Sequence, residues 1–348
     1  MRVLLTGAAG FIGGRVRQLL SDAGHDVVGL DLMLELAHLP GAPVPPGVER
    51  ADVRDGAALD RLLDGVDVVC HQAAMVGNGV DAQDLPGFAA HNDLGTAVLL
   101  AAMARRGISR LVLASSMVVY GEGRYVCADH GDAPPAPRRA ADLEQGLFDP
   151  RCPRCDAPLG WALVDEQAPL LPRSSYAASK IAQEHYAGAW ATLENGRCIA
   201  LRYHNVYGPH MPADTPYSGV AAVFRSALER GKAPQVFEDG GQMRDFVHVD
   251  DIARANVAAV ERVAGHPDGV TAYNVCSGHP RTIGQLAAAL AEALSGPAPL
   301  VTGRHRAADV RHVVASPQAA TRGLGFTAQV VPEVGMHAFA SAPLRPTR

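Results

Sequence analysis

Short runs of apolar residues recur along the first two thirds of the chain, and stretches with a helical spacing of apolar positions separate them. A short, unbroken apolar run is typical of a strand in a parallel sheet that is covered on both faces. The pattern predicts strands within 3–5, 27–30, 48–51, 66–70, 111–114 and 198–203. It predicts helices that begin near 11, 57, 92 and 176, and later ones near 218–230, 250–263 and 282–294. This alternation predicts an α/β fold with a doubly wound parallel sheet and a smaller carboxyl-terminal lobe.

Three glycines follow the first strand and come directly before the first helix. Gly7 permits a tight turn, Gly10 lets the backbone approach a pyrophosphate, and Gly13 allows close packing of the helix. The N-terminus of that helix presents unpaired N–H groups to an anion. Asp31 ends the second strand, where a carboxylate accepts hydrogen bonds from both ribose hydroxyls and repels a 2′-phosphate. The pattern therefore predicts a Rossmann-type dinucleotide site that prefers NAD to NADP.

Two further strand ends carry candidate cofactor contacts. After the third strand, Asp52 and Val53 are placed to touch the adenine ring, with a helix cap as the alternative role of Asp52. After the fourth strand, Ala73 and Ala74 are small enough for the cofactor to lie against the backbone. His71, at the same strand end, is expected to be a hydrogen-bonded structural histidine rather than a catalyst.

A serine, a tyrosine and a lysine carry the predicted chemistry. Ser116 follows the strand at 111–114, and side chains at the carboxyl ends of parallel strands face the ligand crevice. A serine that caps a turn is the alternative. Tyr176 and Lys180 are four residues apart, which places both side chains on one face of a helix. There the ammonium can stabilise the phenolate and lower the tyrosine pKa from its unperturbed value of about 10, so that Tyr176 becomes a usable base.

Together these motifs resemble the extended short-chain dehydrogenase/reductase family, and within it the nucleotide-sugar epimerases and dehydratases. The motifs that carry the resemblance are Gly7-x-x-Gly10-x-x-Gly13, Asp31, Asp52-Val53, Asn92-x-x-Gly95-Thr96, Ser115-Ser116-x-x-x-Tyr120-Gly121, Tyr176-x-x-x-Lys180, Asn205-x-Tyr207-Gly208-Pro209, Arg244-Asp245-Phe246-Val247-His248-Val249-Asp250-Asp251, Tyr273-Asn274-Val275 and Arg306-x-x-Asp309. We expect an NAD-binding domain at 1–205, which the segment 246–272 rejoins, and a nucleotide-sugar-binding lobe at 206–348.

The resemblance also implies roles for individual residues. Ser116, Tyr176 and Lys180 match the catalytic trio of the family. Arg244 and Arg306 match residues that hold the diphosphate of a sugar nucleotide, a use that suits bidentate guanidinium groups, although a surface salt bridge is the alternative for each. The implied cofactor contacts are Gly7, Gly10, Phe11, Ile12, Gly13, Asp31, Asp52, Val53, Ala73, Ala74, Asn92, Ser115, Tyr176 and Lys180. The implied substrate contacts are Ser116, Asn205, Val236, Phe237, Arg244 and Arg306.

Two positions narrow the reaction. The family's 4,6-dehydratases carry an Asp-Glu pair where this chain has Met117 and Val118, and neither of these side chains moves a proton. We therefore expect an NAD-dependent 4-epimerase of a dTDP- or UDP-hexose, acting through a transient 4-keto sugar. A 4-ketoreductase that consumes NAD(P)H and a non-catalytic sensor that binds the dinucleotide are the alternatives. His204, where the family more usually has an aromatic or apolar residue, has no explanation in the sequence.

An insertion at 122–172 interrupts the pattern between the Ser116 strand and the Tyr176 helix. It holds eight prolines and little periodicity, which predicts a loop without a core of its own. Cys127 and His130, with Cys152 and Cys155, supply four ligands in two short-spaced pairs, as a structural zinc site requires. Reduced thiols or a redox Cys-x-x-Cys pair are the alternatives. Similar insertions occur in bacterial proteins of the resembling group, which favours a deoxythymidine or uridine diphosphate hexose as substrate.

Composition adds exclusions rather than chemistry. The 348 residues have a net charge of −5, which provides no basic surface for nucleic acid or an anionic membrane. Apolar stretches such as 96–104 are too short to span a bilayer. Six cysteines in a chain of this size do not make a disulfide framework. We expect a cytoplasmic protein, and homodimerisation is an expectation of the resemblance alone.

Overall fold

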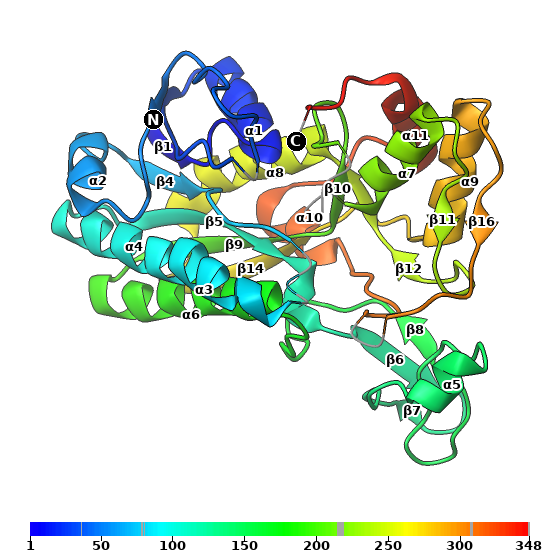
Figure 1. Cartoon of the computed structure of the whole chain (residues 1–348). Coiled ribbons are helices and arrows are strands. Elements are labelled where there is room, and N and C mark those ends of the chain that lie inside the picture. The colour runs from blue at the N-terminus through cyan, green and yellow to red at the C-terminus, as the bar shows by residue number, and fades with distance from the viewer. Residues whose placement is uncertain (36, 78, 80, 214–218, 307–308, 347–348) are drawn as a thin grey trace.

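A seven-stranded sheet forms the centre of the molecule (Figure 1). The computed structural model describes residues 1–35, 37–77, 79, 81–213, 219–306 and 309–346. The strand order is β14-β9-β5-β4-β1-β2-β3, and every pairing is parallel. The strands are β1 (Arg2–Thr6), β2 (Asp26–Asp31), β3 (Val48–Arg50), β4 (Val68–His71), β5 (Arg110–Ser116), β9 (Arg197–Tyr203) and β14 (Gly269–Val275). The order reverses between β1 and β4, and a sheet of this kind binds ligands outside the carboxyl ends of its strands at that point.

Helices cover both faces of this sheet. On one face α1 (Phe11–Asp22) packs against α8 (Val249–Arg262), and the other face carries α2 (Gly56–Leu62), α4 (Gly95–Arg105) and α6 (Ser175–Glu194). The short elements η1 (Ala82–Asp84), α3 (Leu85–Phe88) and the π-helix η2 (Ala89–Leu94) lead into α4. Successive residues of β1 supply the two cores, since Val3 and Leu5 join the cluster under α1 and α8, and Leu4 joins the opposite one. Burial on both faces explains why β1 is apolar throughout its centre.

The predicted α/β fold with a large parallel sheet is confirmed, and each predicted strand overlaps an observed one. The predicted helices at 250–263 and 282–294 correspond to α8 and α9 (Ile283–Ala293). The helix predicted at 218–230 corresponds to α7 (Val220–Glu229), and residue 218 lies outside the described residues. Boundaries shift by a few residues because helix ends are set by caps that hydrophobic spacing does not reveal.

The smaller lobe packs α7, α9 and α11 (Pro332–Ser341) around a core that includes Phe246, Leu286 and Met336. Its strands pair in three short sheets, β10 (Asn205–Tyr207) with β13 (Phe246–His248), β11 (Gln235–Val236) with β16 (Leu300–Val301), and β12 (Met243–Arg244) with β15 (Arg281–Thr282). After β13 the chain runs along the large sheet as α8, η4 (Val263–Gly265) and β14. Helix α10 (Gln318–Leu324) then packs against α8 and β14 before the chain ends at the lobe.

The carboxyl-terminal tail corrects one prediction. The sequence pattern predicts a frayed end at 345–348. The main-chain nitrogen of Arg345 instead donates to the carbonyl oxygen of Met211 at 3.0 Å, and its own carbonyl accepts from Ala213 at 3.0 Å. The tail is therefore paired to the lobe as far as Arg345, while residues 347–348 lie outside the described part of the chain.

The insertion is a small folded unit rather than a loop. Figure 1 shows it projecting beneath the smaller lobe, with an antiparallel sheet in the order β7-β6-β8 and the short helix α5. These elements are β6 (Arg124–Cys127), β7 (Gly131–Asp132), α5 (Ala140–Glu144) and β8 (Gly160–Ala162), and η3 (Met117–Tyr120) precedes them. The expected absence of a core was wrong, because a buried cluster joins Tyr125, Cys127, Ala133, Cys152 and Leu159. Within the described residues, no helix is both long and apolar enough to cross a bilayer.

Candidate active site

The glycine turn after β1 is shaped for close approach. Gly7 has a φ of 68°, in the left-handed region, and a Cβ on it would lie 2.8 Å from the nitrogen of Ala73. A Cβ on Gly13 would lie 1.9 Å from the carbonyl oxygen of Gly7. Gly10 is the N-cap of α1 and provides no side-chain cap, so the first N–H groups of the helix, including those of Phe11 and Ile12, remain for a ligand. The turn fits the pyrophosphate of a dinucleotide.

Asp31 is held at the rim of the same turn. Its carboxylate accepts hydrogen bonds from the main-chain nitrogens of Ala9 at 2.9 Å and Met33 at 2.8 Å. These bonds fix a carboxylate acceptor in the wall of a pocket that collects half of the predicted cofactor contacts. Predicted residues in that wall are Gly7, Gly10, Asp31, Asp52, Val53, Ala73 and Ala74.

The four prolines at positions 40, 43, 45 and 46 predict a surface loop at 32–48, and the first part of this segment contributes to the pocket. Leu34, Ala37 and His38 line it, and the His38 ring lies 3.7 Å from the carboxylate of Asp31. Burial lowers the pKa of His38, and Asp31 opposes that shift. The surface prediction was therefore wrong for His38, which is buried, whereas Leu34 and Ala37 are half-buried in the pocket wall.

Asp52 is engaged by a neighbour. Arg54 donates to both carboxylate oxygens, with the shortest distance 2.6 Å. Burial raises the pKa of Asp52, but the hydrogen bonds from Arg54 outweigh it and the net pKa is below the usual value. The cap of α2 is Asp55, which accepts from the nitrogens of Ala57 and Ala58. Asp52 thus belongs to the pocket wall, and the alternative role of helix cap falls to Asp55.

Two of the implied cofactor residues are buried and bond other residues of the protein. Asn92 is completely buried, and its amide bonds both main-chain polar groups of Met75 and the hydroxyl of Ser179. The hydroxyl of Ser115 donates to Glu184 at 2.5 Å. His71 bonds Thr6 and Thr96 through its two ring nitrogens, as expected for a structural histidine, and burial lowers its pKa to about 3.

The three predicted catalytic residues converge at the carboxyl end of β5. Tyr176 lies in the first turn of α6, which Ser174 caps by accepting from the nitrogen of Ala177. Ser116 bonds the Tyr176 hydroxyl and also accepts from the nitrogen of Val118, so it caps the turn, as its alternative role required, and lies beside the predicted base. The ammonium nitrogen of Lys180 lies 5.9 Å from the centre of the Tyr176 ring.

The protonation of this trio differs from the sequence expectation. Burial raises the pKa of Tyr176 to about 12, and the hydrogen bond with Ser116 opposes the rise only in part. Burial also lowers the pKa of Lys180 to about 7, while Glu184 acts in the other direction. Lys180 spends two donors on the carbonyl of Ala114 and the side chain of Gln183, each at 2.9 Å. The depressed tyrosine pKa that was expected therefore requires a further positive charge beside the ring.

Two residues at the junction of sheet and lobe have side-chain polar atoms that are shielded from solvent. The side-chain oxygen of Asn205 has no hydrogen-bond partner among the described residues, which leaves an acceptor at a position predicted to contact substrate. His204 is buried, and both of its ring nitrogens are shielded from solvent. Burial lowers its pKa to about 4, so the ring is neutral. His204 acts as a packed aromatic residue, which agrees with the residue type that is more usual at this position.

The predicted nucleotide contacts fall into two groups. Val236 is fully buried in β11, whereas the ring of Phe237 is partly exposed and lies 5.2 Å from the guanidinium carbon of Arg306 and 5.0 Å from that of Arg304. Arg306 also bonds Asp309 at 2.9 Å in an exposed pair. The structure thus brings Phe237 and Arg306 together. Arg304 was not predicted, since no motif marks it.

Arg244 stands apart from this group. Its guanidinium donates to the carbonyl oxygens of Met243, Val310 and Arg311 at 2.7 to 2.9 Å. Burial lowers its pKa. Those bonds lock Arg244 to the 310–311 segment, and its role toward a diphosphate stays a prediction.

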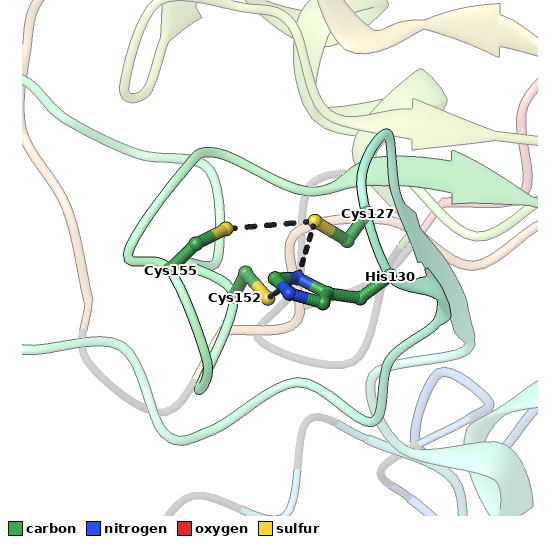
Figure 2. A group of neighbouring side chains, drawn as sticks. All are labelled: Cys127, His130, Cys152 and Cys155. Atoms are coloured by element: carbon green, nitrogen blue, oxygen red, sulfur yellow. Dashed lines mark hydrogen bonds between the residues drawn. The ribbon is translucent and has the colours of Figure 1, made fainter.

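The four predicted metal ligands converge in the insertion (Figure 2). Cys127 and His130 flank the β6–β7 hairpin, and Cys152 and Cys155 come from one loop. Their ligand atoms all lie within 4.8 Å of one another. The sulfur of Cys127 is 3.6 Å from that of Cys155 and 3.4 Å from the His130 ring nitrogen Nδ1. In a tetrahedral zinc site with bonds of about 2.3 Å, two sulfurs are about 3.8 Å apart, so the donor set and its spacing fit zinc.

A buried ion pair behind the trio was missed by sequence reasoning. Glu184 accepts two hydrogen bonds from Arg202 at 2.8 and 3.0 Å, and both side chains are at most 6% exposed. Arg202 also donates to the hydroxyl of Tyr120. The pair ties α6 to β9, and the bond from Ser115 to Glu184 adds β5, so both strands hold the helix that carries Tyr176. The signal in the sequence was Arg202, a charged residue within the apolar run 198–203, because a buried charge needs a partner.

Comparison with known proteins shows that the chain matches one family model and is similar to named proteins. Residues 3–141 and 160–276 match the model of the "NAD dependent epimerase/dehydratase family". The chain is 32% identical over 341 residues to dTDP-L-rhamnose 4-epimerase from Burkholderia thailandensis, covering 94% of this chain and 91% of that protein. It is 32% identical over 304 residues to UDP-glucose 4-epimerase from Mycolicibacterium smegmatis, covering 85% and 84%.

Solved structures give the same result. The UDP-glucose 4-epimerase of Thermotoga maritima, solved with UDP-glucose, superposes with a TM-score of 0.79 at 25% identity, covering 98% of this chain and 97% of that one. The UDP-glucose 4-epimerase of Thermus thermophilus, solved with NAD, has a TM-score of 0.75 at 29% identity and covers 98% of each chain.

Proposed function

Because this chain belongs to the NAD-dependent epimerase/dehydratase family, we propose that it is an NAD-dependent 4-epimerase of a dTDP- or UDP-hexose that acts through a transient 4-keto sugar. The observation that carries the proposal is the convergence of Ser116, Tyr176 and Lys180 at the end of β5. The neighbouring strand β4 leads into Ala73 and Ala74 in the wall of the dinucleotide pocket. Both named relatives invert the same carbon.

The residues of the chain supply the proton chemistry. When bound, NAD would supply the redox chemistry, which is the reversible uptake of a hydride from sugar C4. Tyr176 takes the proton of the C4 hydroxyl and gives it back, and Ser116 holds the same oxygen. Tyr176, whose pKa burial raises to about 12, would lose its proton more readily beside the positive charge that oxidised NAD would bring when bound, while Lys180 ties α6 to β5 through the carbonyl oxygen of Ala114.

Substrate rotation needs an anchor at the other end of the ligand. Phe237 and Arg306 would hold the nucleoside diphosphate, and the free acceptor of Asn205 would meet it near the sheet. A ketone that stays attached at its diphosphate can turn its opposite face to the hydride donor. This anchoring is what separates an epimerase from an enzyme that releases the ketone.

The test is the product and cofactor balance of the purified protein. We expect bound NAD, and interconversion of C4 epimers of UDP- or dTDP-hexoses by NMR without net consumption of NADH. Stoichiometric oxidation of NADH would instead establish the 4-ketoreductase. Bound NAD with no turnover on any sugar nucleotide would establish the sensor.

We further propose that the Cys127, His130, Cys152 and Cys155 cluster binds one structural zinc ion. Support comes from the four convergent donors and from the small core that surrounds two of them. The sulfur separation of 3.6 Å is far longer than a disulfide bond of about 2.0 Å. A cytoplasmic setting would keep these thiols reduced and available. Homodimerisation remains part of the proposal by family expectation, and light scattering tests it.

A further inference from the structure

Glu238 is the residue at which the insertion contacts the loop that carries Phe237. Glu238 follows Phe237 between β11 and β12 and has a φ of 52°, in the left-handed region that a glutamate seldom adopts. Its main chain is tied to the facing segment, donating to the carbonyl of Arg304 at 2.8 Å and accepting from Gly303 at 3.2 Å. A strained backbone of this kind persists only where the surroundings hold it.

Two buried arginines hold Glu238 in place. Arg138, from the insertion, donates to one carboxylate oxygen at 2.7 Å, and Arg311 donates to the other at 2.8 Å. The three side chains are only 2 to 3% exposed. Charges buried to this degree keep their positions because losing either partner leaves an uncompensated charge in the interior.

Arg138 also hydrogen-bonds the segment that carries Arg306, the second residue that is predicted to contact the nucleoside diphosphate. Its other guanidinium nitrogen donates to the carbonyl oxygen of Asp309 at 2.6 Å, the residue that pairs with Arg306. One side chain of the insertion therefore bonds the loop behind Phe237 and the segment behind Arg306. Phe237 and Arg306 in turn stack on each other.

The insertion orients Arg138 through its own fold. Arg138 donates to the carbonyl oxygen of Phe148 at 3.3 Å, and Asp149 accepts from Arg311 at 2.8 Å. Phe148 and Asp149 lie just before Cys152 in the chain, so the loop that carries the thiols also carries these contacts. The insertion and the lobe share one buried network of charges.

We propose that Arg138 is a positioning residue for Phe237 and Arg306, so that the insertion completes the binding site for the nucleoside diphosphate end of the substrate. Arg138 acts through Glu238 and Asp309 on Phe237 and Arg306, and it touches neither the sugar nor the dinucleotide. The inference rests on the proposed function, and it assigns the insertion to substrate affinity rather than to chemistry or NAD retention.

The chain offers a matched control at the next residue. Arg139 is exposed and pairs with Asp142 and Asp156, both inside the insertion, without reaching the lobe. We would compare Arg138→Ala with Arg139→Ala for binding of UDP and dTDP by calorimetry, for KM and kcat with UDP- and dTDP-hexoses, and for bound NAD. Arg138→Ala should weaken nucleotide binding and raise KM at least about tenfold, with kcat and NAD content within about twofold of wild type. Arg139→Ala should match wild type.

A conservative variant protects the test against loss of folding. Arg138→Lys keeps the charge but cannot bond both walls, so its KM should lie between those of wild type and Arg138→Ala. Equal nucleotide affinity in wild type and both Arg138 variants would overturn the inference and leave the proposed function intact. A fall in kcat at unchanged KM would also overturn it. If wild type itself binds neither UDP nor dTDP, the proposed function fails as well.

Discussion

The crevice at the carboxyl ends of the large sheet's strands and the insertion below the lobe hold their functional groups in different ways. In the crevice, Gly7, Asp31 and Tyr176 lie at the ends of regular elements, and main-chain bonds fix most of their positions. In the insertion, short strands contribute little, and thiols, a histidine and buried ion pairs hold the chain. The first region is built from backbone, the second from side chains.

The difference teaches where each region is vulnerable. A site on the ends of strands and helices loses one function when one side chain changes, because its scaffold is secured elsewhere. A unit held by a few side chains loses its order when one ligand is removed, because its core of Tyr125 and Leu159 is small. The following variants test that distinction.

The largest effect is expected from Tyr176→Phe. The phenylalanine ring keeps the contact with Phe88, 5.8 Å away, but lacks the hydroxyl that moves the proton. Turnover should fall about a thousandfold, the scale of a lost general base. Bound NAD and zinc should be unchanged by absorption and elemental analysis. A variant with near wild-type turnover would refute Tyr176 as the base.

A Cys152→Ser variant should disorder the insertion and leave the dinucleotide crevice intact. Zinc content should fall from about one ion per chain to almost none, since a tetrahedral structural site needs all four ligands. Limited proteolysis should then cut within 122–172, while bound NAD is retained. Cys198→Ala, which removes a buried thiol from β9, is the control and should keep the ion. Loss of NAD in Cys152→Ser would break the distinction between the two regions.

Acid should weaken the two regions at different pH. His71 and His204 lie at the carboxyl ends of β4 and β9. Burial lowers the pKa of His71 from 6.5 to about 3 and that of His204 from 6.5 to about 4. Below pH 6.5 the unfolded chain takes up protons that the folded chain refuses, so stability falls as pH drops. Each histidine contributes about 1 kcal/mol per pH unit.

The insertion responds lower on the pH scale. The hydrogen bond from His312, followed by that from Arg311, lowers the pKa of Asp149 from 3.8 to about 2. The stability from this carboxylate is present above pH 3.8 and is lost as pH falls toward 2. Denaturant unfolding between pH 6.5 and 4.5 should therefore report the histidines. His204→Phe should flatten that slope, and an unchanged slope would remove His204 from this account.

The smallest effect is expected from Asp31→Asn. An amide keeps one acceptor but loses the charge that strengthens bonds to the ribose hydroxyls, so NAD should bind about tenfold more weakly. Discrimination against NADP should also relax, because the repulsion of a 2′-phosphate is gone. Asp22→Asn, at an exposed helix end, is the control. Fluorescence titration of both variants with NAD and NADP measures the change.

The sequence predicted the crevice better than the insertion for a physical reason. Strand, glycine turn and helix are successive in the chain, so Gly7, Gly13 and Tyr176 are recognisable from local spacing. Arg138 and Glu238 are 100 positions apart, and nothing in the neighbourhood of either residue announces the other. Long-range ion pairs satisfy charges that a pattern analysis assigns to the surface.

The same reasoning explains the remaining differences. The spacings Cys127-x-x-His130 and Cys152-x-x-Cys155 predicted the ligand cluster. The core around Tyr125 was not predicted, because its apolar residues come from separate strands and turns. Arg345 lies at the end of the chain, where pattern favours fraying, yet backbone pairing with the lobe decides its position. Burial decides protonation too, and it raised the pKa of Tyr176 where spacing to Lys180 predicted a decrease.

The most direct test of the central claim follows one hydrogen atom. UDP- and dTDP-hexoses that carry deuterium at C4 would be incubated with the purified protein, without added cofactor, and the products analysed by NMR. A hydride that is removed and returned within one active site predicts C4-inverted product with the deuterium still on C4. Inverted product whose C4 deuterium has been replaced by solvent hydrogen would contradict the account.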